Sequence, residues 1–119
     1  MKLTVHLDRR ALVIREDGGA EIDLGSGTRA PYESTQDAVH RAAGVIVRHC
    51  KCVDGAGRPA LDRLAGLVER GELELELSGH PRECYVAALH FWVVYGVEAE
   101  GLPWSRGARG GIKLTAVTD

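Results

Sequence analysis

The chain has 119 residues, of which 45% are hydrophobic and 27% are charged, and its formal net charge is −2. This length and composition are typical of one globular domain and exclude a disordered chain or two independent cores. The small negative charge also argues against a general polyanion binder, which usually has a clear basic excess. We therefore expect a single domain spanning residues 1–119.

The sequence has no run of about 18 apolar residues that would predict a membrane-spanning helix, and its start lacks a signal-peptide pattern. The chain has three cysteines, Cys50, Cys52 and Cys84. An odd number of cysteines without a secretory context favours free thiols in a reducing compartment. We expect a cytoplasmic protein without membrane contact or a cofactor, such as an accessory protein encoded by a phage or mobile element.

The chain begins with alternating apolar and polar side chains, which have the period of a half-buried strand. Arg9-Arg10 is a tight connection within this pattern. Asp17-Gly18 is a strong hairpin signal, because glycine accepts the positive φ of primed turns. Residues 2–24 therefore predict a three-stranded antiparallel meander, which a glycine-rich loop follows.

Two amphipathic helices come next. Ser34 can cap the first helix, whose apolar residues recur at helical spacing along one stripe: Val39, Ala42, Ala43, Ile46, Val47 and Cys50. Pro59 and Gly71 bracket the second helix, since proline is tolerated in a first turn and glycine often follows a last one.

The run Glu72–Leu77 alternates strictly between acidic and apolar residues and predicts a strand. Pro81 and Gly96 bracket the next segment with the proline-start and glycine-end asymmetry of a helix. Its aromatic and β-branched residues also suit a strand. We predict a helix that is apolar on most sides and therefore largely buried, and a last strand over Ile112–Val117.

Together these elements predict an α+β fold in the order βββ-α-α-β-α-β. An antiparallel sheet, made of the meander and the later strands, would carry two or three helices on one face.

A cysteine and a histidine lie close together at the start of the third predicted helix. The positive end of a helix dipole can lower the pKa of the Cys84 thiol, and His80 could act as its base. This arrangement would suit the catalytic pair of a small cysteine hydrolase. We favour the other interpretation, in which Cys84 is a small core residue and His80 precedes the helix without facing it.

The run Ser78-Gly79-His80, with Cys84 and the small residues Ala87 and Ala88 after it, resembles the motif of the ribosomal-processing cysteine proteases. That resemblance implies a small α+β enzyme that trims a ribosomal protein with a His–Cys dyad. The spacing between histidine and cysteine is much shorter here, and the family has its motif near the amino end. The run is therefore not assigned to that family.

His49, Cys50 and Cys52 have side chains of the kinds that bind zinc. A single residue separates the two cysteines, whereas zinc-binding pairs usually have about two to four residues between them. Cys50 also belongs to the apolar stripe of its helix. We predict no metal site, with Cys50 and Cys52 as the weaker alternative ligands.

Residues 101–113 are rich in glycine and arginine. Trp104, Arg106 and Arg109 suit contact with a protein partner, or stacking and phosphate contact with a nucleic acid. The alternative is a hairpin connection whose tryptophan packs against the core.

Glu72, Glu74 and Glu76 project from one side of their predicted strand, where they repel one another unless cations lie nearby. They predict a solvated sheet face or a protected edge strand. The functional alternative is an acidic strip that recognises a basic partner.

No set of residues forms a convincing catalytic constellation. We therefore expect a small accessory or regulatory module that acts by protein–protein contact, through the glutamates and the 101–113 loop, with a homodimer as one possibility. A cysteine hydrolase using Cys84 and His80 is the alternative, and nucleic-acid binding through 101–113 is the weaker one.

Overall fold

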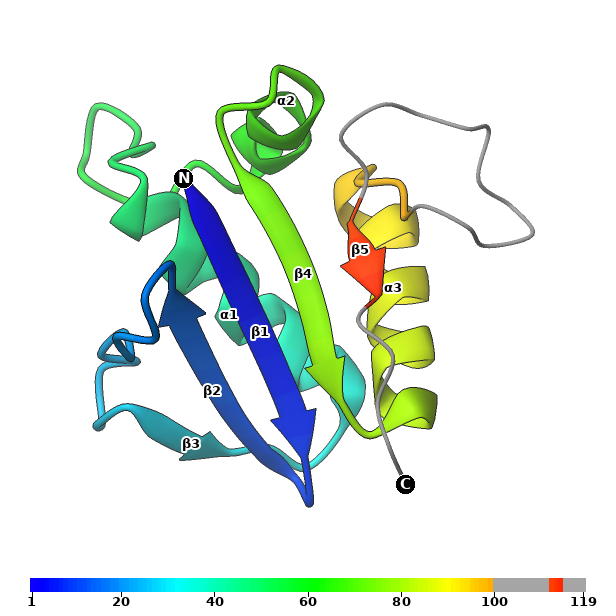
Figure 1. Cartoon of the computed structure of the whole chain (residues 1–119). Helices are drawn as coiled ribbons and strands as arrows, with labels where there is room; N and C mark the ends of the chain where they lie inside the picture. Colours follow the sequence, from blue (N-terminus) through cyan, green and yellow to red (C-terminus); the bar gives the residue numbers. More distant parts are fainter. Residues whose placement is uncertain (100–111, 115–119) are drawn as a thin grey trace.

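The computed structural model describes residues 1–99 and 112–114. These form an α+β fold with one mixed sheet of strand order β3-β2-β1-β4-β5 (Figure 1). The strands are β1 (Lys2–Asp8), β2 (Ala11–Glu16), β3 (Arg29–Pro31), β4 (Glu74–Gly79) and β5 (Lys113–Leu114). The helices are α1 (Thr35–His49), α2 (Leu64–Glu69), preceded by a 3-10 turn at Leu61–Arg63, and α3 (Pro81–Tyr95).

The β1–β2 hairpin confirms the first half of the predicted meander. The two strands pair antiparallel from Leu3 opposite Glu16 to Asp8 opposite Ala11. Arg9 and Arg10 form the turn with φ of 51° and 59°. Both residues are therefore in the left-handed region that a two-residue hairpin turn requires and that residues with side chains seldom adopt.

The predicted third strand near residues 20–24 is wrong. Only an isolated bridge between Arg15 and Glu21 forms there. Asp23 ends the extended backbone, because its Oδ1 accepts the backbone N–H of Gly25 at 2.8 Å and of Gly27 at 3.4 Å. The chain turns through this loop, and the third strand is β3, which pairs antiparallel with the first half of β2.

The prediction of an antiparallel sheet is also wrong for the second half of the chain. β4 pairs parallel with β1, from Lys2 opposite Glu74 to Leu7 opposite Gly79, and β5 pairs parallel with β4. The long connection through α1 and α2 allows β4 to run in the same direction as β1, as parallel neighbours require. Alternation within a strand gives no information on that direction.

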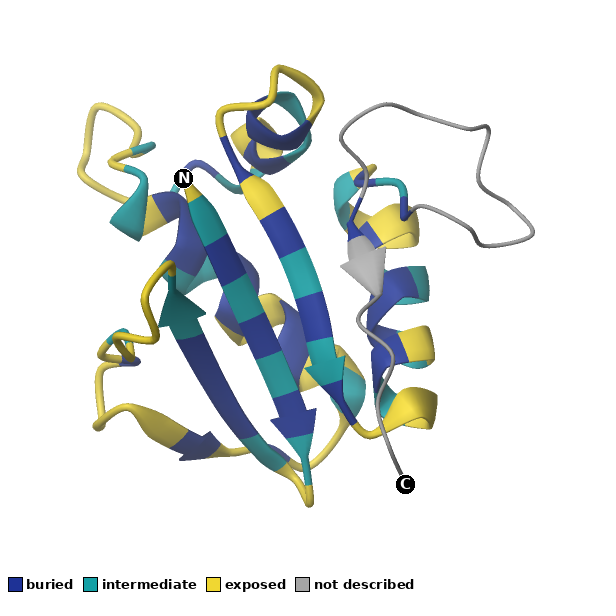
Figure 2. Cartoon of the chain, viewed as in Figure 1, coloured by how far each residue is buried: buried dark blue, intermediate teal, exposed yellow. Residues whose placement is uncertain are grey.

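The core lies between one face of the sheet and helices α1 and α3 (Figure 2). Alternate residues of β1 and β4 point into it: Leu3, Val5, Leu7, Leu75 and Leu77. The apolar stripe of α1 packs on them and includes Ile46 at 0% exposure. The cap of α1 is as predicted, since the Ser34 hydroxyl accepts the Asp37 backbone N–H at 3.2 Å.

Residues 81–95 are a helix, as predicted. Pro81 occupies the first turn, and Gly96 ends the helix with φ of 71°. The predicted burial is only partly correct, because one side of α3 is buried and the opposite side faces solvent (Figure 2). Within residues 1–99 and 112–114, no helix has the length and apolar character needed to cross a membrane.

The core assignment gives a stability prediction. Ile46 and Leu64 are both 0% exposed, so Ile46→Ala and Leu64→Ala should each lower the free energy of unfolding by about 2–5 kcal/mol. Urea denaturation measures the change. Arg41→Ala, on the exposed side of α1, is the control and should change stability by about 0.5 kcal/mol or less. If neither core variant lost more stability than Arg41→Ala, the core assignment would be contradicted.

Candidate interaction surface

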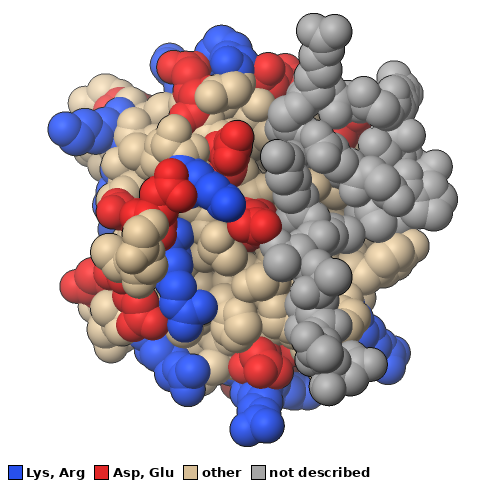
Figure 3. Space-filling model, viewed as in Figure 1, with Lys and Arg blue, Asp and Glu red and all other residues tan. Residues whose placement is uncertain are grey.

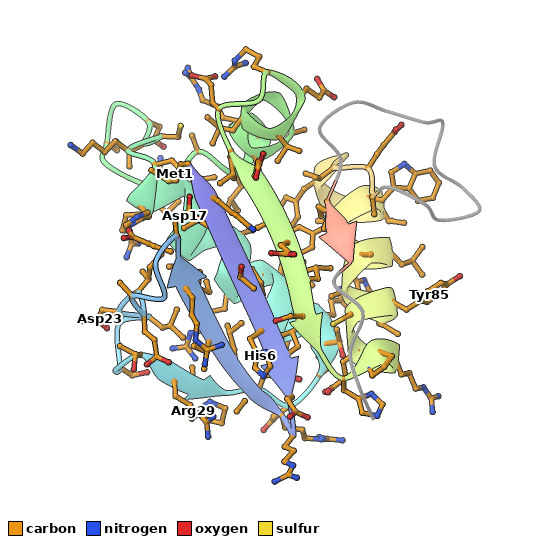
Figure 4. The ribbon with its side chains drawn as sticks, viewed as in Figure 1. Met1, His6, Asp17, Asp23, Arg29 and Tyr85 are labelled. Atoms are coloured by element: carbon orange, nitrogen blue, oxygen red, sulfur yellow. The ribbon has the colours of Figure 1, made fainter. Side chains whose placement is uncertain are left out.

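Helix α3 has two apolar sides. Its buried side packs on the sheet and α1 through Cys84, Ala87, Ala88 and Phe91. The opposite side carries a second apolar set, here called the outer α3 face: Tyr85, Val86, Leu89, Trp92 and Val93. Because these positions recur at three- and four-residue spacing, they form a continuous stripe along the helix. In Figure 4 the Tyr85 side chain points away from the body of the molecule.

Three residues of the outer α3 face are exposed to solvent although they are apolar, whereas Val86 and Leu89 are half-buried. Val93 is 65% exposed, Tyr85 46% and Trp92 37%, and the neighbouring Val94 is 45% exposed. No Asp, Glu, Lys or Arg occurs between Glu83 and Glu98. Single exposed apolar side chains are ordinary, whereas a contiguous apolar patch is typical of an interaction site.

Contacts at both ends of α3 hold this face in position. The Tyr32 hydroxyl donates a hydrogen bond to Glu83 Oε1 at the start of the helix. At its end, His40 of α1 contacts the Tyr95 hydroxyl, with the two rings in an edge-to-face arrangement at 5.7 Å. A partner would therefore meet a preorganised helix and would not have to order it on binding.

The structure brings Cys84 and His80 to the start of α3 but into different environments. Cys84 is buried, whereas His80 is exposed and precedes the helix. Burial raises the pKa of the Cys84 thiol to about 11, and the nearby carboxylates of Glu83 and Asp8 add to the increase. Desolvation and these negative charges outweigh the helix dipole, so the environment disfavours the thiolate that a cysteine hydrolase needs.

His49, Cys50 and Cys52 lie at the end of α1. Both cysteines are half-buried, and burial raises the pKa of the Cys50 thiol, with Cys52 contributing. The His49 ring contacts Glu16 at the end of β2. In the described part of the chain, no three His, Cys, Asp or Glu side chains are grouped so that they could hold a metal ion.

The sequence predicts that the three glutamates share one strand, but the structure places only two of them in β4. Strand β4 begins at Glu74, and Glu72 precedes it and pairs with Arg70. Glu76 is half-buried, with Lys2 Nζ at 3.4 Å. Since β4 lies between β1 and β5 in the sheet, it is not an edge strand. The other predicted contact residues, Trp104, Arg106 and Arg109, lie outside the described residues.

The open face of the sheet carries a pair that the sequence analysis missed. His6 Nδ1 lies 2.9 Å from Ser78 Oγ across β1 and β4. A serine next to a histidine is a candidate nucleophile, but acyl transfer also needs donors aimed at the oxyanion. Strand β1 is paired on both sides, so its N–H groups are used within the sheet. We interpret the pair as a cross-strand contact.

Acidic and basic side chains are intermixed on this open face (Figure 3). Lys2, on β1, lies next to Glu76, and Arg15, on β2, pairs with Glu21 at 3.4 Å. A face that binds nucleic acid by phosphate neutralisation needs an excess of positive charge. The described residues of this face show no such excess of positive charge.

A cavity of about 350 Å³ lies between the amino ends of α1 and α3, near the carboxyl ends of β1 and β4. Ligands of α/β proteins often bind at such ends. The charged side chains that line it are two arginines, Arg10 and Arg82, and two glutamates, Glu33 and Glu83. These charges balance, so the lining favours neither an anion nor a cation.

A second cavity, of about 390 Å³, lies between α1 and the chain that follows β2. Ile22, Leu24 and Val45 give it an apolar wall. Its rim includes Glu16, which contacts His49. This mixture of groups does not define a ligand class.

The fold and this surface together define the chain as an α+β domain that exposes an apolar helix face. No protein-family model, no curated protein and no solved structure matches it.

The signal in the sequence for the outer α3 face is weak. An amphipathic helix shows one apolar stripe, but α3 is apolar nearly all round, which is also the pattern of a fully buried helix. The uncharged run between Glu83 and Glu98 is the one feature that could have indicated the surface.

The raised pKa of Cys84 gives a direct chemical prediction. At neutral pH, iodoacetamide should alkylate Cys84 in the folded protein at least about 100-fold more slowly than a model thiol, because the thiolate fraction falls about tenfold per pKa unit. The rate should keep rising with pH up to about 11. Mass spectrometry of the labelled peptides measures the alkylation rate of Cys84, and urea-unfolded protein is the control. Faster labelling of Cys84 than of Cys52 at pH 7 would support the hydrolase instead.

Proposed function

We propose that this protein is a small accessory or regulatory module that acts by protein–protein contact, and that α3 provides the contact surface. The observation that supports this proposal is the exposed, uncharged outer α3 face. Burial of apolar surface contributes about 25 cal/mol per Å², so covering this face would be favourable. The helix is already folded and anchored, which reduces the entropy lost on binding.

A helix that presents side chains at three- and four-residue spacing fits an apolar groove or another helix. Aromatic residues are enriched among the residues that contribute most to binding energy, and the outer α3 face includes Tyr85 and Trp92. The partner we propose is therefore a protein with an apolar surface of matching shape.

The finer features of the proposal come from the sequence. Contacts through Trp104, Arg106 and Arg109, with an acidic contribution from the glutamates around β4, would extend the surface. A cytoplasmic location is supported by the three free cysteines, since thiols persist in a reducing compartment. A phage- or mobile-element-encoded accessory protein would have this small size.

Site-specific photocrosslinking tests the contact surface. A photoreactive amino acid in place of Val93 should give discrete adducts in cells, because this side chain is 65% exposed on the proposed surface. The same amino acid in place of Arg41, on the exposed side of α1, is the matched control and should give none. An excess of unlabelled protein should compete away the Val93 adducts, and an excess of its Val93→Asp variant should not.

Equal adduct patterns at the two positions, or no adducts at position 93, would contradict the proposed function. Thermal melting checks the variants. Val93→Asp should leave the melting temperature nearly unchanged, since an exposed side chain contributes little to the core.

A further inference from the structure

We propose that Cys50, Cys52 and Met1 form a binding site for Cu(I), in which two thiolates and one thioether hold this soft monovalent ion. The inference goes beyond the proposed function and does not depend on it. It is supported by three sulfur-bearing side chains that meet at the carboxyl end of α1, by the distance between two of their sulfur atoms and by the donor chemistry of the set.

The carboxyl end of α1 turns both cysteines toward the core. Cys50 caps the helix, and Lys51 has a φ of 61°, in the left-handed region that often ends a helix. The chain reverses there, with the Cys52 backbone N–H donating to the Val47 carbonyl at 2.8 Å. Both cysteines pack against the edge of the core, whereas Lys51 between them is exposed. Burial and the neighbouring Cys52 thiol raise the pKa of Cys50, as expected for two thiols that lie close together.

Met1 brings the third sulfur from the strand side. Its carbonyl accepts the Glu74 backbone N–H at 2.8 Å, and its amino group donates to the Glu72 carbonyl at 3.3 Å, so its backbone is held beside β4. The Met1 Sδ lies 3.7 Å from the Cys50 Sγ, at the end of α1 (Figure 4). Two sulfur atoms bonded to one ion at about 2.3 Å lie about 3.8 Å apart in tetrahedral geometry and about 4.0 Å apart in trigonal geometry. The two sulfur atoms therefore have nearly the spacing of ligands on one ion.

The donor set favours Cu(I) over other metals that bind sulfur. Thiolate and thioether ligands are soft and select Cu(I), zinc and iron–sulfur clusters. Structural zinc sites and iron–sulfur clusters take four protein ligands. The adjacent His49 ring contacts Glu16, and in the described residues no three His, Cys, Asp or Glu side chains are grouped to hold a metal. Cu(I) has a filled d shell and is stable with three ligands, so two cysteines and one methionine suit it.

The site is accessible, and its two thiols must lose their protons to bind the ion. Met1 is 58% exposed and both cysteines are half-buried, which leaves an entry path for the metal. An ordinary thiol, with a pKa of about 8.5, is protonated near neutral pH. Each thiol gives up its proton as its sulfur bonds to the ion, so one Cu(I) releases two protons. The affinity for Cu(I) should therefore increase as the pH rises.

Competition with the chromophoric chelator bicinchoninate, without oxygen and with ascorbate as reductant, measures Cu(I) binding to the whole chain. One Cu(I) should bind per chain, and an equal concentration of Zn(II) should not displace it. Cys50→Ser and Cys52→Ser should each weaken binding at least about 100-fold, because a hydroxyl is a hard donor. Cys84→Ala removes the thiol outside the site and is the matched control, with unchanged affinity. Circular dichroism checks the folding of each variant.

Selenium tests the third ligand without a change to either cysteine. Met1 is the single methionine of the chain, so growth on selenomethionine places one selenium atom at the proposed site. X-ray absorption at the selenium edge should show a copper atom within about 2.5 Å of the selenium. Norleucine in place of Met1 replaces the thioether sulfur by a methylene group and should weaken Cu(I) binding by about tenfold or more.

A copper neighbour of selenium, together with weaker binding in both cysteine variants, would support the three-sulfur site. Selenium without a copper neighbour, or full Cu(I) affinity in either cysteine variant, would overturn it. Displacement of Cu(I) by an equal concentration of Zn(II) would overturn the assignment of the metal. None of these measurements involves the outer α3 face, so their failure is distinct from a failure of the proposed function.

Discussion

The close contact between Gly79 and the backbone of Leu7 determines where the second half of the molecule lies. Gly79 ends β4 with φ of 112°, and a Cβ atom added to it would lie 2.0 Å from the Leu7 carbonyl oxygen. The next residue, His80, donates its backbone N–H to that same oxygen at 2.8 Å. A single carbonyl of β1 thus fixes both the end of β4 and the approach to α3, which begins one residue later.

That junction explains the two sides of α3. Because β4 lies directly beside β1, the helix that follows returns across the same face of the sheet that α1 covers, and its small residues Ala87 and Ala88 are fully buried. The other side of the helix has no layer above it in the described residues. Val93 on that side is 65% exposed, which is consistent with this topology.

Sequence periodicity predicted the local structure well where a physical signal acts within a few residues. Ser34 caps α1, Pro81 and Gly96 bracket α3, and the Arg9-Arg10 turn closes the first hairpin, as expected. The third strand was misplaced because the Asp23 side chain, through contacts to backbone N–H groups, closes a loop that composition alone leaves extended. The direction of β4 was not predictable, since alternation is the same in parallel and antiparallel strands.

The candidate site was harder to predict than the fold. For Cys84, the sequence shows the favourable helix dipole but not the burial and the two carboxylates that outweigh it. For α3, an even distribution of apolar residues indicates burial on all sides, and only the three-dimensional arrangement shows which side is uncovered. In both cases the sequence gives the chemistry of a side chain without its surroundings.

The free energies of unfolding of Gly79→Ala and Gly71→Ala, compared in urea, test the central junction most directly. Gly71 also has a positive φ, 73°, but an added Cβ would meet nothing within 4 Å, so its substitution should cost only about 1–2 kcal/mol. Gly79→Ala should cost that strain plus the clash with Leu7, about 3 kcal/mol or more in total. Equal losses for the two variants would contradict the account, because they would show that the β1–β4 contact does not require glycine.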